Sequence, residues 1–151
     1  MRPKLVRYEA PGWGVGELWL AGDRVLASSH PRPGRPARVA DCYLAERLQA
    51  WFAGARDDFL DVELDLDDGF HGECARILRG VPAGQVITYG ELAERAGRPR
   101  AARAAGTFCA RNRFAVLVPC HRVVAAGGIG SFGELGVSYK RRLLELDGVA
   151  G

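Results

Sequence analysis

Alternating hydrophobic and polar positions predict a β-hairpin near the start of the chain. Two apolar-rich runs, at 14–20 and 24–28, are separated by the turn-forming sequence Ala21-Gly22-Asp23. The stretch 30–36 that follows contains three prolines and one glycine, and it predicts a loop.

The next pattern predicts one helix and one further strand. Apolar side chains between Val39 and Phe52 recur at helical spacing, and Gly54 is expected to end that helix. Strict alternation over 60–66 predicts a half-buried strand with an acidic outer face. The polar turn sequence at 67–69 then indicates a domain boundary.

The second half of the chain predicts mainly helices. Two short helices, over 91–96 and 99–110, are joined by a glycine-containing turn, and Pro99 is expected to open the second. This pattern is typical of a helix-turn-helix. The other expected elements are a helix over 74–79, an extended piece over 86–88, an apolar strand-like run over 114–118, a glycine-rich loop over 127–136 and a final helix ending near 146.

These patterns predict a two-domain α/β protein. The N-terminal domain, over 1–68, is expected to combine a small antiparallel sheet with a helix, and the C-terminal domain, over 69–151, is expected to be mostly α. A chain of 151 residues has room for one ordinary domain or two small ones.

Charge is distributed unevenly between the two halves. Residues 1–70 contain 9 basic and 12 acidic side chains, whereas residues 71–151 contain 12 and 6. The basic second half suggests contact with a polyanion such as nucleic acid. A coding bias toward arginine explains the same composition, since 19 of the 21 basic residues are Arg.

Several classes of protein are disfavoured by composition. No apolar run approaches the roughly 20 residues of a membrane span, and the N-terminus lacks the apolar core of a signal peptide. The cysteines show no paired spacing that would suggest a zinc site or a disulfide framework, so we expect reduced thiols, no metal and a cytoplasmic protein. Three of them are expected to serve in packing: Cys42, Cys74 and Cys109.

Cys120 is the sharpest chemical feature. It follows an apolar run and Pro119, and it precedes His121 and Arg122. A nearby base or cation helps to generate the thiolate that acts as a nucleophile. A buried structural cysteine is the alternative interpretation.

The predicted helix over 99–106 is rich in small side chains, with arginines projecting from it. Small residues allow a backbone to approach a DNA groove closely, where Arg contacts phosphates or enters the base stack. A helix packed against a neighbour explains the alanines equally well.

Taken together, five segments resemble the O6-alkylguanine-DNA alkyltransferase family. Their order and spacing also match, and the resemblance is specific over about 70–148, whereas 1–66 resembles the family's variable, ribonuclease-H-like N-terminal domain only loosely. The segments are the sequence from Val81 to Ala93, that from Gly97 to Gly106, Asn112, the run Val118-Pro119-Cys120-His121-Arg122-Val123-Val124, and Lys140 to Leu144.

The resemblance implies suicidal repair of DNA. Cys120, activated through water by His121, would take the alkyl group from O6 of guanine, with O4 of thymine as a second candidate target. Tyr89 would stabilise the departing base, Asn112 would tie the helix-turn-helix to the active-site segment, and Asp147 would orient the histidine. No metal or cofactor is implied.

The resemblance also implies a monomer that binds the minor groove of double-stranded DNA carrying alkylated guanine. The base would be flipped out, and Arg103 would fill the vacated space. Pocket residues would be Val123, Phe132 and Gly133, with backbone atoms of Cys120 and Val123 reading the guanine edge. Further DNA contacts would come from Thr88, Arg98, Arg100, Ala101, Ala102, Ala104, Gly106 and Arg122.

Some positions depart from the family pattern. Asp147 stands where the family usually has Glu, and a surface aspartate near a helix end is the alternative interpretation. Because its side chain is shorter by one C–C bond, about 1.5 Å, we expect contact with His121 only through a shifted helix or a water. Phe132 replaces a usual Tyr in a longer loop, and Arg113 replaces a common Pro. A non-catalytic lesion-binding protein is therefore the alternative function.

Overall fold

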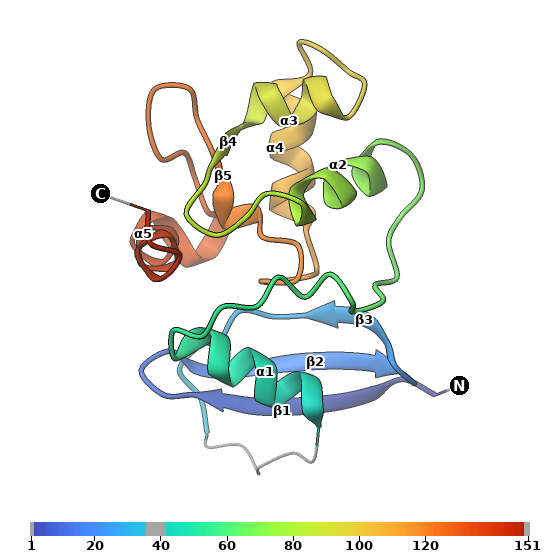
Figure 1. Ribbon diagram of the computed structural model, residues 1–151, viewed down its shortest axis with the longest axis vertical. Helices are drawn as coiled ribbons and strands as arrows, with labels where there is room; N and C mark the ends of the chain where they lie inside the picture. Colours follow the sequence, from blue (N-terminus) through green and yellow to red (C-terminus); the bar gives the residue numbers. More distant parts are fainter. Residues whose placement is uncertain (1, 36–41, 150–151) are drawn as a thin grey trace. The chain divides into compact units, whose positions relative to one another are not determined.

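The computed structural model describes residues 2–35 and 42–149 (Figure 1). Contacts divide the chain into two compact units. The first contains the chain up to Asp65 together with Arg113–Leu117, and the second contains Leu66–Asn112 and the chain from Val118 onward. The division precedes the boundary expected at 68/69 by three residues, and it places five residues of the second half in the first unit.

The first unit is built on an antiparallel sheet with strand order β1-β2-β3. The strands are β1 (Lys4–Ala10), β2 (Gly14–Ala21) and β3 (Arg24–Ser28). The hairpin of β2 and β3 agrees with its prediction. Strand β1 was not predicted, although polar Arg7 and Glu9 alternate there with buried apolar residues, namely Val6, Tyr8 and Ala10.

Helix α1 (Tyr43–Phe52) covers one face of this sheet (Figure 1). Its Leu48, Trp51 and Phe52 are buried, and burying each such side chain stabilises the fold by roughly 1.5–3 kcal/mol. Phe52 is the last helical residue and Gly54 follows with φ +106°, as the helix-end prediction requires. Val39, where the helix was expected to begin, lies outside the described residues.

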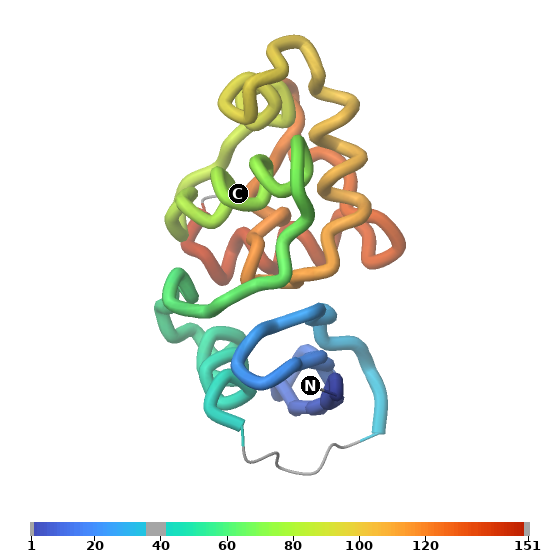
Figure 2. The backbone as a smooth tube through the Cα atoms, turned by 90° about the vertical axis from the view of Figure 1, so that its right-hand side faces the viewer, coloured from blue at the N-terminus to red at the C-terminus, as the bar shows by residue number. Residues whose placement is uncertain are grey.

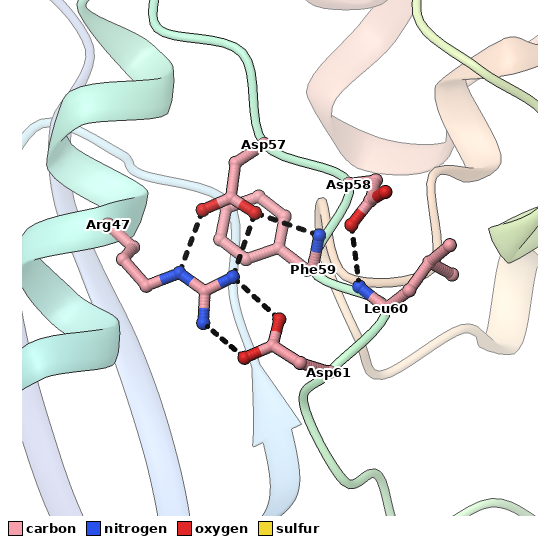
Figure 3. A network of polar contacts seen from close by, with 6 residues as sticks. All are labelled: Arg47, Asp57, Asp58, Phe59, Leu60 and Asp61. Carbon is pink, nitrogen blue, oxygen red and sulfur yellow. Dashed lines mark hydrogen bonds and ion pairs between the residues drawn. The ribbon is translucent and has the colours of Figure 1, made fainter.

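The strand predicted over 60–66 is wrong. Only Leu64 forms a bridge, parallel to Val25; residues 60–62 form a turn and a bend, and residues 65–67 belong to no regular element. The acidic residues explain the difference, because Asp57 and Asp58 accept hydrogen bonds from the backbone N–H groups two residues ahead and hold the chain in turns (Figure 3).

Arg47 of α1 fixes this acidic segment in place. Its guanidinium donates to both carboxylate oxygens of Asp57 at 2.8 Å and to Asp61 at 2.8 and 3.0 Å (Figure 3). The hydrogen bonds from Arg47 lower the pKa of the Asp57 carboxyl below its ordinary value. The same guanidinium lies over the buried ring of Phe59, 5.1 Å from its centroid, so the clamp joins charge pairing to aromatic packing.

The run 114–118 is buried but is not a strand, which corrects the sequence-based expectation. Phe114 forms a single parallel bridge with Ser28, and Val116 has φ +68°, which no strand accommodates. The Ser28 hydroxyl also donates to Ala115 O at 2.9 Å. In the loop 30–36, Arg32 bridges Val15 through two backbone hydrogen bonds.

The second unit is mostly helical, with one short parallel strand pair in which Ile87 lies opposite Val123. Turns of 3₁₀ helix occur at Cys120–Arg122 and Gly133–Leu135. Its elements are α2 (Gly69–Arg79), β4 (Ile87–Thr88), α3 (Tyr89–Arg95), α4 (Ala102–Arg111), β5 (Val123–Val124) and α5 (Gly136–Leu146).

Helix α2 begins five residues earlier than predicted, and both helices of the predicted helix-turn-helix also begin elsewhere than expected. Helix α3 starts two residues early because Thr88 and Glu91 form a reciprocal capping box. Helix α4 starts only after Ala101, so Pro99 does not open it. Pro99 lies in a turn in which Ala101 N–H donates to Arg98 O at 3.2 Å. Helices α3 and α4 lie side by side in both views (Figure 1 and Figure 2).

None of the helices within residues 2–35 and 42–149 combines the length and apolar character needed to cross a bilayer. Cys74 is fully buried, as expected for a packing residue. Cys42 and Cys109 are half-buried, and Cys42 is the residue that precedes α1 and not part of its apolar face.

Candidate active site

Cys120 lies at the start of a buried 3₁₀ turn that follows Pro119. Only 7% of the residue is exposed. Burial raises the pKa of the thiol above its ordinary value, while a hydrogen bond from Asn112 and the charge of Lys140 act in the opposite direction. The resting group is therefore a thiol, which needs a base in order to become a strong nucleophile.

His121 and Asp147 form a direct buried pair. The His121 Nε2 atom lies 2.8 Å from Asp147 Oδ2, and neither side chain is exposed. Asp147 immediately follows α5, and its N–H donates to Leu143 O at 3.0 Å. It is thus not a surface aspartate, and its shorter side chain reaches the histidine without a water between them.

The protonation states of this pair follow from burial and hydrogen bonding. Burial opposes ionisation of Asp147, but hydrogen bonds from Arg122 and His121 prevail and lower its pKa to about 2. Burial lowers the pKa of His121 below its ordinary value, against the opposing effect of Asp147. Because a carboxylate only accepts, neutral His121 carries its proton on Nε2 and its lone pair on Nδ1.

Arg122 corrects one sequence-based expectation, since it was expected to contact DNA. Its side chain is buried and its Nε and Nη2 donate to the two oxygens of Asp147 at 2.7 and 2.9 Å. Its Nη1 donates to Val81 O at 2.8 Å. All three donor nitrogens are therefore used inside the protein.

Asn112 ends helix α4 and connects it to the nucleophile segment. Its Nδ2 donates to Val118 O at 2.9 Å, two residues before Cys120. The carboxamide thus holds a backbone group of the turn in register with the helix.

Lys140 is a site residue whose role was not predicted from the sequence, although it lies in one of the five segments that carry the resemblance. Its side chain is fully buried, and its Nζ lies 2.6 Å from Val123 O, 3.2 Å from Ser131 O and 3.5 Å from Tyr89 Oη. Burial lowers the pKa of this ammonium. A signal was present, because Lys140 shares the buried face of α5 with Leu143 and Leu144, and Asp147, just after the helix, continues the same spacing.

Tyr89 is clamped by the glycine-rich loop as well as by Lys140. Burial raises the pKa of the phenol above its ordinary value, while hydrogen bonds from Ser131 act in the opposite direction. Gly130 has φ +80°, and a Cβ there would lie 3.0 Å from the tyrosine oxygen. Only glycine allows the loop to pass this close to the ring.

The three expected pocket residues differ in exposure. Val123 is fully buried, and its carbonyl accepts from Lys140. Phe132 is half-buried and stacks on Tyr139, with ring centroids 6.2 Å apart and an interplanar angle of 21°. Gly133 is exposed with φ +50°.

The remaining expected DNA contacts lie around α3 and α4. Arg98, Arg100 and Arg103 are exposed, and none forms a salt bridge within the described part of the chain. Arg98 lies over the Phe70 ring at 4.8 Å, and Arg100 has φ +71°. Thr88 caps α3; Ala102 is exposed, Ala101, Ala104 and Gly106 are half-buried, and a Cβ at Gly106 would meet nothing within 4 Å.

Comparison with known proteins agrees with this arrangement. Residues 69–149 match the model of the 6-O-methylguanine DNA methyltransferase DNA-binding domain, which is more than half of the chain. The chain belongs to this family. A methylated-DNA–protein-cysteine methyltransferase of Mycolicibacterium paratuberculosis is 43% identical, covering 95% of this chain and 93% of the relative. A methylated-DNA–protein-cysteine methyltransferase of Methanopyrus kandleri is 42% identical, over 70% of this chain and 79% of the relative.

Solved structures of family members share the fold. Mycobacterium tuberculosis OGT in complex with DNA superposes with a TM-score of 0.81 at 33% identity, covering 95% of this chain and 92% of that one. An O6-methylguanine-DNA methyltransferase from Pyrococcus kodakaraensis gives a TM-score of 0.72 at 26% identity, over 98% of this chain and all of that one. The small antiparallel sheet with accompanying helices is thus the architecture of the family.

Within the described residues, no three His, Cys, Asp or Glu side chains lie together as a metal site would require.

Proposed function

We propose that this protein repairs alkylated DNA by direct reversal, transferring an alkyl group from O6 of guanine to its own Cys120. The protein is a methylated-DNA–protein-cysteine methyltransferase, as its relatives are. The observation that carries the assignment is the buried Cys120 thiol, followed in the chain by a histidine that Asp147 holds in the tautomer of a general base.

The reaction is a single displacement at carbon. The Cys120 sulfur forms a bond to the alkyl carbon while the bond from that carbon to O6 breaks, and the electron pair leaves with guanine. The thiol proton passes through a water to Nδ1 of His121. The departing guanine anion takes up one proton, for which the Tyr89 O–H is the donor, and the proton held by His121 is the equivalent that returns the site to its neutral state. Because the thioether is not hydrolysed, each molecule reacts once.

Tyr89 is suited to stabilise the leaving base. Its oxygen receives hydrogen bonds from Lys140 and Ser131, which donate to it. Its own O–H is therefore left to donate to the base, where negative charge develops as the carbon–oxygen bond breaks.

DNA binding is assigned to α3 and α4, acting as a helix-turn-helix on the minor groove of a duplex. The small side chains of Ala101, Ala102, Ala104 and Gly106 allow close approach of the backbone. Arg103 fills the space of the flipped base, and Arg98 and Arg100 contact phosphates. Thr88 contacts the DNA from the start of α3. The flipped base enters a pocket formed by Val123, Phe132 and Gly133. A ribonuclease-H-like N-terminal domain, a monomer and a cytoplasmic location belong to the same proposal.

Intact-protein mass spectrometry tests the function. Incubation with an oligonucleotide containing O6-methylguanine should add one methyl group per molecule, and peptide mapping should place it on Cys120. Binding of the oligonucleotide without any mass increase would instead identify a lesion-binding protein.

A further inference from the structure

The carboxylate of Asp147 has two partners with different tasks. His121 uses one of its oxygens, whereas Arg122 binds both, through Nε at 2.7 Å and Nη2 at 2.9 Å. All three side chains are shielded, with exposed fractions of 0% for His121 and Asp147 and 7% for Arg122. A two-point contact of this kind fixes the plane of the carboxylate as well as its charge.

Arg122 is itself held from a second direction. Its Nη1 donates to Val81 O at 2.8 Å, at the residue that begins the turn after α2. The guanidinium therefore joins that turn to the end of α5. This anchoring accounts for the direct contact with His121, because the orientation of Asp147 is set by a rigid three-point support.

Charge gives Arg122 its second task. A buried Asp–His pair with a neutral histidine carries one unbalanced negative charge, which uptake of a proton on the imidazole would cancel. A histidine protonated in the resting state cannot accept the thiol proton. The guanidinium supplies the balancing charge instead, so the carboxylate stays ionised while the imidazole stays neutral.

The charged groups that change the pKa of His121 are Asp147, Arg122 and Lys140. Cys120 is its neighbour in the chain. Asp147 favours protonation of the imidazole, whereas the positive charges of Arg122 and Lys140 oppose it and act with burial to lower the His121 pKa. Removing Arg122 removes the cation that touches the carboxylate directly.

We propose that Arg122 is a positioning residue for alkyl transfer, which holds Asp147 as an ionised, oriented acceptor and thereby keeps His121 able to take the thiol proton. The inference rests on the proposed function, since it assigns a role in that reaction. It also replaces the sequence-based expectation that Arg122 contacts DNA.

The test uses Arg122→Met, which removes the charge, and Arg122→Lys, which keeps the charge but not the two-point contact. The matched control is Arg141→Met, at an exposed arginine of α5. Single-turnover transfer from an O6-methylguanine oligonucleotide is measured against pH, and DNA affinity is measured against salt for each variant in a Cys120→Ala background.

Arg122→Met should slow transfer at least tenfold at neutral pH and move the acidic limb of the rate profile to higher pH. In Arg122→Lys, the acidic limb should lie close to its position in the parent protein, whereas the transfer rate should recover less completely. Both variants should bind DNA within about twofold of the parent, and Arg141→Met should react normally. If Arg122→Met does not fold, the transfer rate and pH profile of Arg122→Lys, compared with those of the parent protein, test the proposal.

Two results would overturn the proposal. One is an unchanged rate and pH profile in the folded variants. The other is a loss confined to DNA affinity, with the slope of log affinity against log salt reduced by about one, which would identify a phosphate contact. If the protein without any substitution were not methylated at Cys120, the proposed function itself would be contradicted. That outcome is distinct from the two results above.

Discussion

Replacing Asp147 with asparagine removes one buried charge and leaves the shape of the side chain nearly unchanged. The substitution strands the buried Arg122 guanidinium without its counter-ion. The amide also presents an N–H toward His121, which favours the tautomer with its proton on Nδ1. That tautomer cannot accept the thiol proton, so both stability and transfer should suffer.

The magnitude follows from the pKa of Asp147, which lies near 2 in the native protein against 3.8 for an unperturbed aspartate. A depression of this size corresponds to roughly 2.5 kcal/mol of stability at neutral pH. Leaving the partner of a buried ion pair uncompensated costs about 3–5 kcal/mol in general. We therefore expect a loss of about 3 kcal/mol or more.

The pH dependence has a definite sign. Because the native pKa is lowered, the contribution is fully present well above pH 3.8 and is lost as pH falls from about 5 toward 2. The stability difference between the parent and Asp147→Asn should shrink over that window. The lowered pKa of His121 adds a second destabilisation on acidification, which begins when the unfolded-state histidine protonates near pH 6.5.

Urea unfolding followed by far-ultraviolet circular dichroism, which reports the helices of the second unit, measures the loss, with Asp23→Asn in the exposed β2–β3 turn as control. Single-turnover transfer should fall by roughly 10²-fold or more, the usual contribution of a general base. A loss below about 1 kcal/mol, together with a rate profile that superimposes on that of the parent, would refute the coupling between Asp147, Arg122 and His121.

Three further substitutions and one control test other parts of the site. Cys120→Ala should abolish transfer with DNA binding largely intact, whereas Cys109→Ala should transfer normally; methyl removal by the Cys120 variant would show that the nucleophile is misassigned. Arg103→Ala should slow repair of duplex DNA by roughly 10–100-fold more than attack on the free methylated base, which needs no flipping, and equal losses on the two substrates would place Arg103 in chemistry or folding. Lys140→Met should raise the pH at which the thiol ionises, since the ammonium lowers the pKa of Cys120; an unchanged rate–pH profile would remove Lys140 from the electrostatics of the site.

Local patterns in the sequence determined the elements whose causes are themselves local. The β2–β3 hairpin has its turn residues between two apolar runs, and α1 ends before Gly54 because glycine adopts the conformation that terminates a helix. The family resemblance rested on five short segments, their order and their spacing, all of which can be read along the chain; in the run around Cys120 the nucleophile and the adjacent base are neighbours.

Only the tertiary structure decided which charges meet. Arg122 and Asp147 are 25 residues apart, and no periodicity indicates that the arginine turns inward to a carboxylate rather than outward to DNA. The alternation over 60–66 predicted a strand, but Arg47 holds the acidic segment from α1, so ion pairing outweighed β propensity.

The burial of Lys140 was also decided by the tertiary structure, since an ammonium is tolerated in a core only where enough acceptors converge on it. Carbonyls of Val123 and Ser131 and the oxygen of Tyr89 come from three separate segments of the chain. The sequence by itself determined which chemical groups are available, and their convergence depended on packing because hydrogen bonds between distant segments have no local signature.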